Sequence, residues 1–266
     1  MIKIVSWNTG TSDQFTDFFY TVKADIFCVQ ELQLPEIQFL RFNPSGYYSY
    51  WNWKKKNKQL GTAVFTKLKP ISCTWGIGSE LDKEGRSMII EYSKFYLVNV
   101  LTPQSSCKYD QVRLEWDIQF SQYIQKLLKK KPVVLCGNLN VAHQSLDVST
   151  STYEGIGCTK PERIGINHLI ELGMVDTYRC CYPLCREYTW HDYDLAMRLD
   201  YCLISNNLQA ELVNSTINGS LEAAHKPIEI TLSLETPDTI PVIPVNPYML
   251  LYFANKLPKP LESVNE

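Results

Sequence analysis

Short apolar runs, each bounded by polar residues, glycine or proline, constrain the fold of this chain more than any other feature. Runs rich in β-branched and aromatic residues predict strands, and they lie at 2–6, 26–30, 47–53, 61–66, 72–76, 87–92, 95–101, 132–136, 200–204 and 227–233. Amphipathic helices are expected at 12–22, 110–129 and 161–172, because residues such as Trp116, Phe120 and Ile124 recur at helical spacing. Two strand-rich halves, each with helices, indicate an α/β protein.

Composition and length agree with a single large globular domain. A chain of 266 residues can bury a sizeable core, and 45% hydrophobic with 20% charged residues is ordinary for such a domain. No run reaches the roughly 18 apolar residues of a transmembrane helix, so no membrane association is expected. The alternation of Ile2 and Ile4 predicts a strand and not a signal peptide. We therefore expect a cytoplasmic or nuclear protein.

The nine cysteines favour a reducing compartment. Several, such as Cys28, Cys136 and Cys202, lie inside apolar strand-like runs, which suits small buried side chains better than a disulfide framework. A zinc site is the alternative for a second group, although its spacing fits no common ligand pattern. That group comprises Cys180, Cys181, Cys185 and His191.

A set of motifs follows one another in a recognisable order. They are IVSWN at 4–8, ADIFCVQE at 24–31, EGR at 84–86 with YLVNV at 96–100, VLCGNLNVAH at 134–143, YTW at 188–190 with RLDY at 198–201, and AAH at 223–225. In this order they resemble the exonuclease III type of apurinic/apyrimidinic (AP) endonuclease, within the endonuclease/exonuclease/phosphatase superfamily. The resemblance covers residues 1–234 and implies one domain there, a four-layered α/β sandwich of two mixed β-sheets flanked by helices.

The resemblance implies Mg²⁺-assisted hydrolysis of a phosphodiester beside an abasic sugar. Matched site positions are Asn8, which orients the site, Glu31, which binds the metal, Asn140, beside the attacking water, and Asp200, behind His225. Each also has a simpler interpretation. The asparagines can cap loops, Glu31 can be a solvated charge, and Asp200 can pair with the nearby Arg198.

Other family positions have lost their chemistry. Asn138 stands where the resemblance places the aspartate that activates the water, and an amide cannot accept that proton. Ala224 replaces a second aspartate, Leu101 replaces a tyrosine that reaches the phosphate, and Thr9, Gly10 and Thr11 supply no acid after Asn8. Loss of a general base typically costs about 10²–10⁴ in rate.

These losses predict a pseudonuclease with weak or lost Mg²⁺ binding that acts as a binding or scaffold subunit, in a DNA-handling assembly. The alternative is a divergent Mg²⁺-dependent AP endonuclease or phosphodiesterase of DNA repair with a rearranged site. In that case Glu222, Asp192 or Asp194 would supply a substitute carboxylate. Surface charge is the simpler interpretation of all of them.

Weak binding of double-stranded DNA is expected. By resemblance, the substrate-binding positions are Arg113, Trp190, Leu199 and Met197, the last in place of a tryptophan. A net charge of −2 gives no general attraction to phosphate. The basic run 54–58 is either a nucleic-acid loop or a soluble hairpin turn, and the lysines at 129–131 favour a helix C-terminus.

Residues 235–266 form a proline-rich apolar tail beyond the resemblance. Proline prevents regular structure over most of the tail, yet the tail is too apolar for an idle disordered segment. We expect a short helix near 247–256. The tail either covers its own domain or binds a protein partner through residues 240–260.

Overall fold

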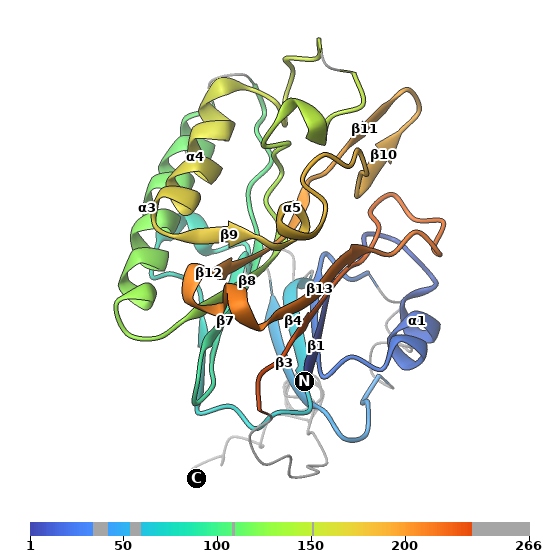
Figure 1. The fold of residues 1–266 in the computed structure, drawn as a ribbon, viewed down its shortest axis with the longest axis vertical. Coiled ribbons are helices and arrows are strands. Elements are labelled where there is room, and N and C mark those ends of the chain that lie inside the picture. The colour runs from blue at the N-terminus through green and yellow to red at the C-terminus, as the bar shows by residue number, and fades with distance from the viewer. Residues whose placement is uncertain (34–41, 54–59, 108–109, 151, 236–266) are drawn as a thin grey trace, which may run out of the picture.

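Two six-stranded mixed sheets form the centre of the protein (Figure 1). The computed structural model describes residues 1–33, 42–53, 60–107, 110–150 and 152–235, so the predicted tail after Glu235 and the basic run 54–58 lie outside the described part. The first sheet has the order β13(Leu212–Ile217), β14(Ile228–Leu232), β1(Ile2–Asn8), β2(Ile26–Gln30), β4(Leu60–Thr66), β3(Tyr48–Trp53). The second has the order β5(Ser72–Trp75), β6(Ser87–Glu91), β7(Tyr96–Leu101), β8(Val133–Asn138), β12(Asp200–Ser205), β9(Met174–Asp176).

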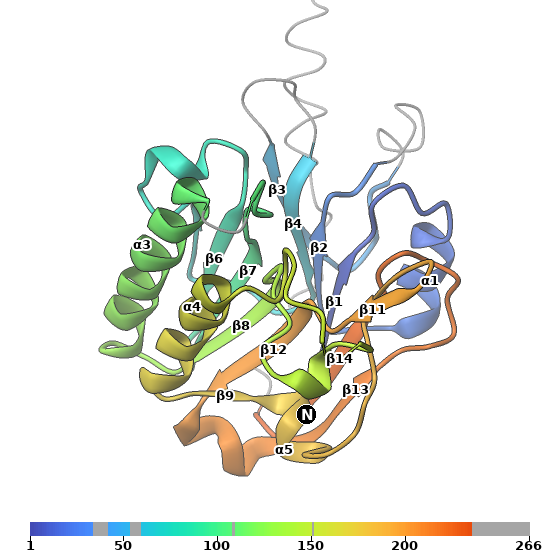
Figure 2. The same ribbon diagram turned by 90° about the horizontal axis from the view of Figure 1, so that it is seen from above.

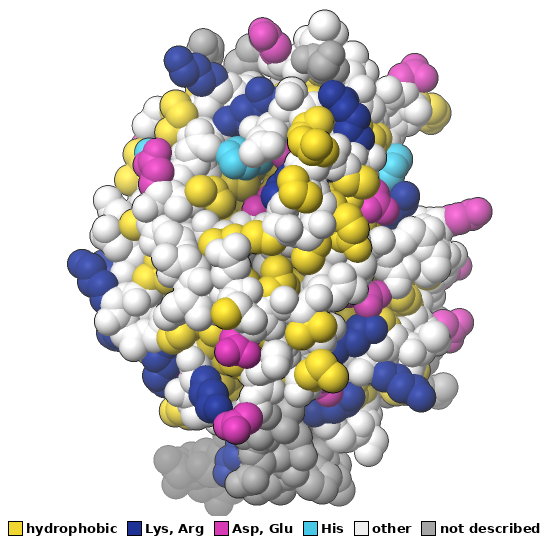
Figure 3. All heavy atoms as spheres, viewed as in Figure 1, with side chains coloured by type: hydrophobic (Ala, Val, Ile, Leu, Met, Phe, Trp, Pro, Cys, Tyr) yellow, Lys and Arg dark blue, Asp and Glu magenta, His cyan; other side chains and the backbone are white. Residues whose placement is uncertain are grey.

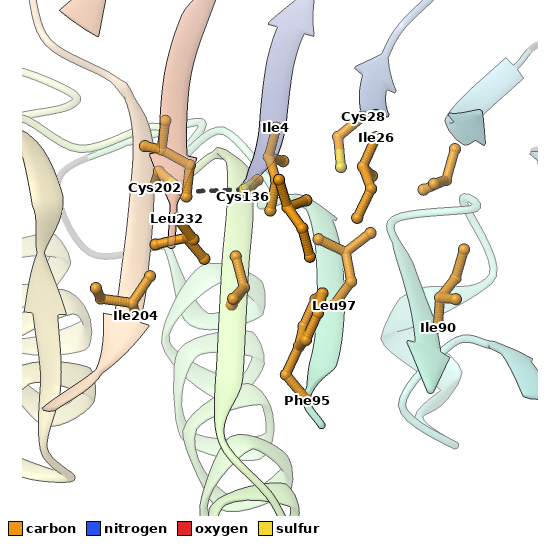
Figure 4. Packing of buried hydrophobic residues seen from close by; sticks show 14 of the residues in the cluster. Ile4, Ile26, Cys28, Ile90, Phe95, Leu97, Cys136, Cys202, Ile204 and Leu232 are labelled. Carbon is orange, nitrogen blue, oxygen red and sulfur yellow. Dashed lines mark hydrogen bonds between the residues drawn. The ribbon is translucent and has the colours of Figure 1, made fainter. Parts of the chain in front are cut away.

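Successive side chains of each strand point to opposite faces of its sheet, and this alternation produces the layers. On β1, Ile2 and Ile4 enter the core between the sheets, whereas Val5 and Trp7 pack on the other side with residues of α1(Phe15–Val22). A continuous apolar run therefore serves both layers. Figure 4 shows this inner core, with Ile4 and Leu232 from the first sheet close to Leu97 and Cys136 from the second.

Helices cover both outer faces, as Figure 2 shows. The helices α3(Gln111–Leu128) and α4(Lys160–Glu171) lie on the second sheet, where Trp116, Phe120 and Ile124 are buried against its strands. The helix α1 lies beside the first sheet. A capping box between Thr159 and Glu162 fixes the start of α4. The predicted four-layered sandwich of two mixed sheets flanked by helices is confirmed.

Every strand predicted from the apolar runs is present, and 26–30 has the predicted limits. Short or exposed elements were missed: β9, β13, the hairpin of β10(Trp190–Asp192) and β11(Leu195–Met197), and the helix α5(Thr177–Cys181). Much of β13 is exposed and it lies at a sheet edge, so it lacks an apolar run. Within the described residues, no helix combines the length and apolar character needed to cross a bilayer.

The central strand pairs bring polar residues to one end of the sandwich. In each sheet one pair is parallel, β1 with β2 and β7 with β8, and the register places Asn8 beside Gln30 and Leu101 beside Asn138. Gly137 allows the second pair to come together, because a Cβ there would overlap the Val100 carbonyl and its φ is +141°. The ends of these strands therefore meet at the candidate site.

Candidate active site

A cavity of about 350 Å³ opens where the parallel strands end. It is lined by Asn8, Glu31, Arg86, Leu101, Thr102, Gln104, Asn138, Asn140, Ile156, Gly157, Trp190, Met197, Leu199 and His225. Residues from distant parts of the sequence thus share one polar cavity with an apolar wall. The structure brings together most of the site positions that the sequence motifs indicated.

Asn8 and Glu31 form one side of the cavity. The Asn8 amide Nδ2 donates to Glu31 Oε2 over 3.1 Å, and Asn8 Oδ1 accepts the Gly10 N–H over 3.2 Å. Glu31 has a φ of +54°, an uncommon backbone conformation for this residue type, and its N–H donates to the Gly61 carbonyl over 2.9 Å. Strain of this kind persists only where the surroundings fix it and is frequent at functional sites. Asn8 therefore does more than cap a loop, because it holds the carboxylate.

Asn138 and Asn140 organise the loop after β8. The Asn138 Oδ1 accepts the Asn140 N–H over 2.7 Å, and the Asn140 amide donates to the Thr102 carbonyl over 2.7 Å. The side chain of Asn138 is nearly buried, with 2% of the residue exposed. Its amide oxygen therefore makes a structural hydrogen bond in the position where sequence comparison expects a base.

His225 and Asp200 form the opposite side. His225 Nδ1 lies 2.8 Å from Asp200 Oδ2, and the His225 carbonyl accepts the Trp7 indole N–H over 2.8 Å. Burial alone would lower the pKa of His225, but the charge and hydrogen bond of Asp200, with Glu31 adding, raise it above the ordinary value. The cationic form of this imidazole is therefore more stable than that of an ordinary histidine.

Asp200 does not pair with Arg198. Arg198 is buried and donates instead to Asp147 and Asp176, with N···O distances of 2.8 and 2.7 Å. The Asp200 backbone N–H is held by the Thr189 hydroxyl over 3.1 Å. The alternative prediction of an Asp200–Arg198 ion pair is thus wrong. Asp200 instead orients His225.

The apolar wall consists of Trp190, Met197 and Leu199. The hairpin of β10 and β11 pairs Trp190 with Met197, and the Cys158 thiol lies 3.6 Å from the Met197 sulfur. The backbone of Trp190 also pairs with that of His225 in an isolated antiparallel β-bridge. These predicted substrate-binding positions therefore line the cavity together.

Arg113 differs from the other predicted substrate-binding positions, because it does not line the cavity. Only 2% of the residue is exposed, and its guanidinium donates to the carbonyls of Leu139 at 3.1 Å and Asn140 at 3.3 Å. It also forms an ion pair with Asp117 over 2.8 Å. The side chain is buried beneath the loop that carries Asn140. It therefore supports the backbone of that loop and does not face the cavity.

Arg86 is a cavity residue that the sequence interpretation did not select. It belongs to the EGR motif at 84–86, so the motif itself was the available signal. Burial lowers the pKa of its guanidinium, while nearby Glu84, Asp82 and Glu31 oppose that shift, and arginine remains charged in proteins. Arg86 therefore places a cationic group at the cavity, beside a histidine whose pKa is raised.

Carboxylates are scarce around this cavity. Among the described residues that line it, Glu31 is the sole acid. Ala224 is exposed next to His225, and the suggested substitutes Glu222, Asp192 and Asp194 are exposed and do not line the cavity. Over the described part of the chain, no three His, Cys, Asp or Glu side chains are grouped as a metal site, which includes the zinc alternative near Cys180.

Surface charge does not single out a nucleic-acid face in the view of Figure 3. Lys and Arg side chains are interspersed with Asp and Glu over this face and do not gather in one patch. The formal net charge is −2. Any attraction to phosphate at the site therefore depends on local groups such as Arg86 and His225.

The chain has clear relatives of known class. The model of the Endonuclease/Exonuclease/phosphatase family matches residues 5–220. An exodeoxyribonuclease of Bacillus subtilis is 32% identical over 253 residues, covering 88% of this chain and 100% of the relative. A DNA-(apurinic or apyrimidinic site) endonuclease of Dictyostelium discoideum is 31% identical over 256 residues, covering 88% and 71%. The chain therefore belongs to the exonuclease III-type AP endonucleases of this family.

Solved structures agree on the fold. An AP endonuclease from Archaeoglobus fulgidus superimposes with a TM-score of 0.77 at 24% identity, covering 88% of this chain and 100% of that one. At that identity the likeness concerns architecture alone. Nucleases of the family generally depend on Mg²⁺, so the donor atoms around the cavity decide how well this chain can hold such an ion.

Proposed function

We propose that this protein is a pseudonuclease that binds DNA weakly through the retained cavity and no longer hydrolyses phosphodiesters efficiently. The observation that carries the proposal is Asn138. Its amide has no titratable carboxylate, and its Oδ1 already accepts the Asn140 N–H over 2.7 Å. A water placed beside Asn140 would therefore find no base at position 138.

The donor set also fits Mg²⁺ poorly. This ion is usually held by one or two carboxylates together with waters and substrate phosphates. Here Glu31 is the sole carboxylate among the described cavity residues, and the Oδ1 atoms of Asn8 and Asn138 already accept backbone N–H groups. We infer that Mg²⁺ binding is weak or lost, and no step of the proposed activity depends on it.

Retained groups favour binding of a phosphate. His225 tends toward its cationic form beside Asp200, and Arg86 adds a second positive group at the same cavity. The apolar wall formed by Trp190, Met197 and Leu199 offers a surface for a sugar or base. Together these groups suit one phosphodiester of DNA beside a deoxyribose, which is the substrate class that the relatives' names indicate.

A residual or rearranged hydrolase is the second candidate. The pairs Asn8–Glu31 and Asp200–His225 both keep hydrogen-bonding geometry, at 3.1 and 2.8 Å. Such retention favours some remaining metal-assisted chemistry. Because Asp192, Asp194 and Glu222 are exposed and lie outside the cavity lining, we give them no part in it.

A scaffold role in a DNA-handling assembly, with a protein partner bound through residues 240–260, remains part of the proposal. These residues lie outside the described part of the chain. A cytoplasmic or nuclear location also remains a prediction.

Binding and cleavage of one duplex test the proposal together. The substrate carries a single abasic site, and an undamaged duplex of the same sequence is the control. Fluorescence anisotropy is expected to show weak, salt-sensitive binding, while single-turnover assays with Mg²⁺ and with Mn²⁺ are expected to show negligible cleavage. Metal-dependent cleavage that disappears in Glu31→Ala would overturn the loss of catalysis and support the second candidate.

A further inference from the structure

Free thiols meet in the core between the sheets, below the cavity. Cys28, Cys136 and Cys202 are buried, with 0%, 1% and 5% of each residue exposed. Figure 4 shows Cys136 and Cys202 with a dashed line between them, and their sulfur atoms lie 3.0 Å apart. A disulfide has a sulfur–sulfur distance of about 2.05 Å. A movement of about 1 Å would therefore join them.

We propose that Cys136 and Cys202 form a reversible disulfide on exposure to hydrogen peroxide, which cross-links β8 to β12 beneath the site. The inference concerns the fold's own thiols and does not depend on the proposed function. It also goes beyond the expectation that these cysteines are small buried side chains and not part of a disulfide framework.

Strand register makes the cross-link sterically feasible. Cys136 and Cys202 are directly opposite each other in the antiparallel pairing of β8 and β12. Opposite residues in such a pair have Cα atoms about 4.5 or 5.5 Å apart. Both separations fall inside the range of about 4.4–6.8 Å seen for disulfides. No rearrangement of the sheet is needed for the bond to form.

The local chemistry identifies the attacking thiol. A hydrogen bond from Cys202, and a second from Cys28, lowers the pKa of Cys136 below that of an ordinary thiol, although burial opposes the shift. Burial raises the pKa of Cys28 and Cys202 instead. Because the thiolate is the nucleophile in cysteine oxidation, these hydrogen bonds favour Cys136 as the attacking thiol, while the cross-link itself follows from the 3.0 Å sulfur–sulfur distance.

The reaction balances with peroxide as the oxidant. The Cys136 thiolate attacks one peroxide oxygen, the O–O bond breaks, and Cys136 becomes a sulfenic acid with release of hydroxide. The Cys202 sulfur then attacks the Cys136 sulfur, the S–O bond breaks, and hydroxide leaves. With the protons of both thiols, two water molecules are the by-products. A thiol reductant reverses the bond by exchange.

Burial selects the oxidant. Peroxide is close to water in size and can enter during brief opening of the core, whereas a bulky disulfide such as oxidised glutathione cannot reach a sulfur that is 1% exposed. The exposed Cys107, Cys180 and Cys185 are open to both reagents. We therefore expect the Cys136–Cys202 disulfide to form with peroxide and not with oxidised glutathione.

The position of the cross-link ties it to the site. Asn138 follows Cys136 by two residues on β8, Asp200 precedes Cys202 by two on β12, and the register pairs Asn138 with Asp200. Residues two apart on a strand share a face. A bond between the cysteines therefore fixes the separation of the strands directly under Asp200, which orients His225.

Peptide mapping of the full chain under non-reducing conditions tests the proposal. After peroxide treatment we expect a peptide pair joined through Cys136 and Cys202, a melting temperature raised by roughly 5–10 °C, and reversal of both by dithiothreitol. Oxidised glutathione is expected to modify exposed cysteines without giving this cross-link. The change of Cys107, Cys180, Cys181 and Cys185 to serine removes competing surface oxidation.

Matched variants separate the pair from its neighbour. Cys136→Ala and Cys202→Ala should each abolish the peroxide-dependent rise in melting temperature, while Cys28→Ala should keep it. The proposal is overturned if both thiols stay free at peroxide levels that oxidise the surface cysteines, or if Cys136 joins Cys28 instead. Mapping of the parent chain gives this answer even if an alanine variant fails to fold.

Discussion

Individual side chains in the cavity are held in hydrogen-bonded pairs, and the proposed loss of catalysis rests on one of them, Asn138. Asn8 holds Glu31 and Asp200 holds His225 through single hydrogen bonds. Asn138 is equally well placed, yet its amide is tied to the Asn140 backbone. The loop can therefore keep its shape without a carboxylate at position 138, which explains how the fold tolerates the change.

Titration of His225 tests the electrostatics at this scale. Its folded-state pKa is raised above the ordinary value near 6.5, so the stability from the His225–Asp200 pair is fully present below about pH 6.5 and is lost as the pH rises through the raised pKa. NMR titration should place the His225 midpoint above that of His191, whose pKa is lowered by burial and Lys226. In Asp200→Asn the His225 midpoint should fall; an unchanged midpoint would contradict the assigned cause.

The sequence identified part of this site and missed part of it. Glu31, Asn140 and His225 were found because they belong to ordered motifs. Arg113 was expected at a substrate-binding position and Arg86 was not selected, because sequence does not reveal how deeply each arginine is buried. Arg113 lies beneath the loop, and Arg86 lines the cavity. Burial depends on how separate elements pack, and local patterns do not contain that information.

At the scale of elements, α3 supports the loop that carries Asn140 through one buried arginine. Arg113 bonds the carbonyls of Leu139 and Asn140 and pairs with Asp117, and the side chains of the pair are 3% and 12% exposed. Burial raises the pKa of Asp117 to about 6, although the Arg113 charge opposes that shift. The guanidinium therefore compensates a carboxylate that the core disfavours.

Removal of Arg113 should be costly for this reason. Arg113→Ala is expected to lower the free energy of unfolding by about 3–5 kcal/mol, because it leaves a buried carboxylate without its partner. Urea denaturation measures the loss, and Arg113→Ala/Asp117→Asn, which also removes the buried charge, should recover part of it. A cost below about 1 kcal/mol for the single change would show that Arg113 does not hold the loop.

Long apolar strands and amphipathic helices were predictable elements, because their patterns are local. The hairpin of β10 and β11 was not, since its strands have three residues each. That hairpin carries Trp190 and Met197 into the cavity wall. The part of the cavity wall that we propose to contact a sugar or base is thus built partly from the shortest elements.

The whole molecule is organised around one core between two sheets. The apolar cluster there draws residues from both sheets, for example Ile4 and Ile230 from the first and Leu97 and Val134 from the second. Neither sheet can keep its inner face dry without the other. The resemblance of the motifs implied this arrangement, whereas alternation alone indicated the α/β class without the pairing order.

Unfolding should therefore be cooperative over the described domain. Trp7 reports on the layer between α1 and the first sheet, and Trp116 reports on the layer between α3 and the second sheet. The chain has six tryptophans, so the part of the fluorescence change that disappears in Trp7→Phe, or in Trp116→Phe, isolates that reporter. In urea both parts should have the same midpoint as the far-ultraviolet circular dichroism of the parent chain. Separate transitions for the two layers would contradict a shared core.

Introduction of carboxylates at positions 138 and 224 tests the central claim most directly. Single-turnover cleavage of a duplex with one abasic site, in Mg²⁺, should be negligible for the natural chain and should rise by about 10²-fold or more in Asn138→Asp/Ala224→Asp, with Asn138→Asp intermediate. Glu31→Ala in the double variant is the control and should remove the gain. Efficient cleavage by the natural chain, unchanged in Asn138→Asp, would contradict the account of a nuclease fold that has lost its base.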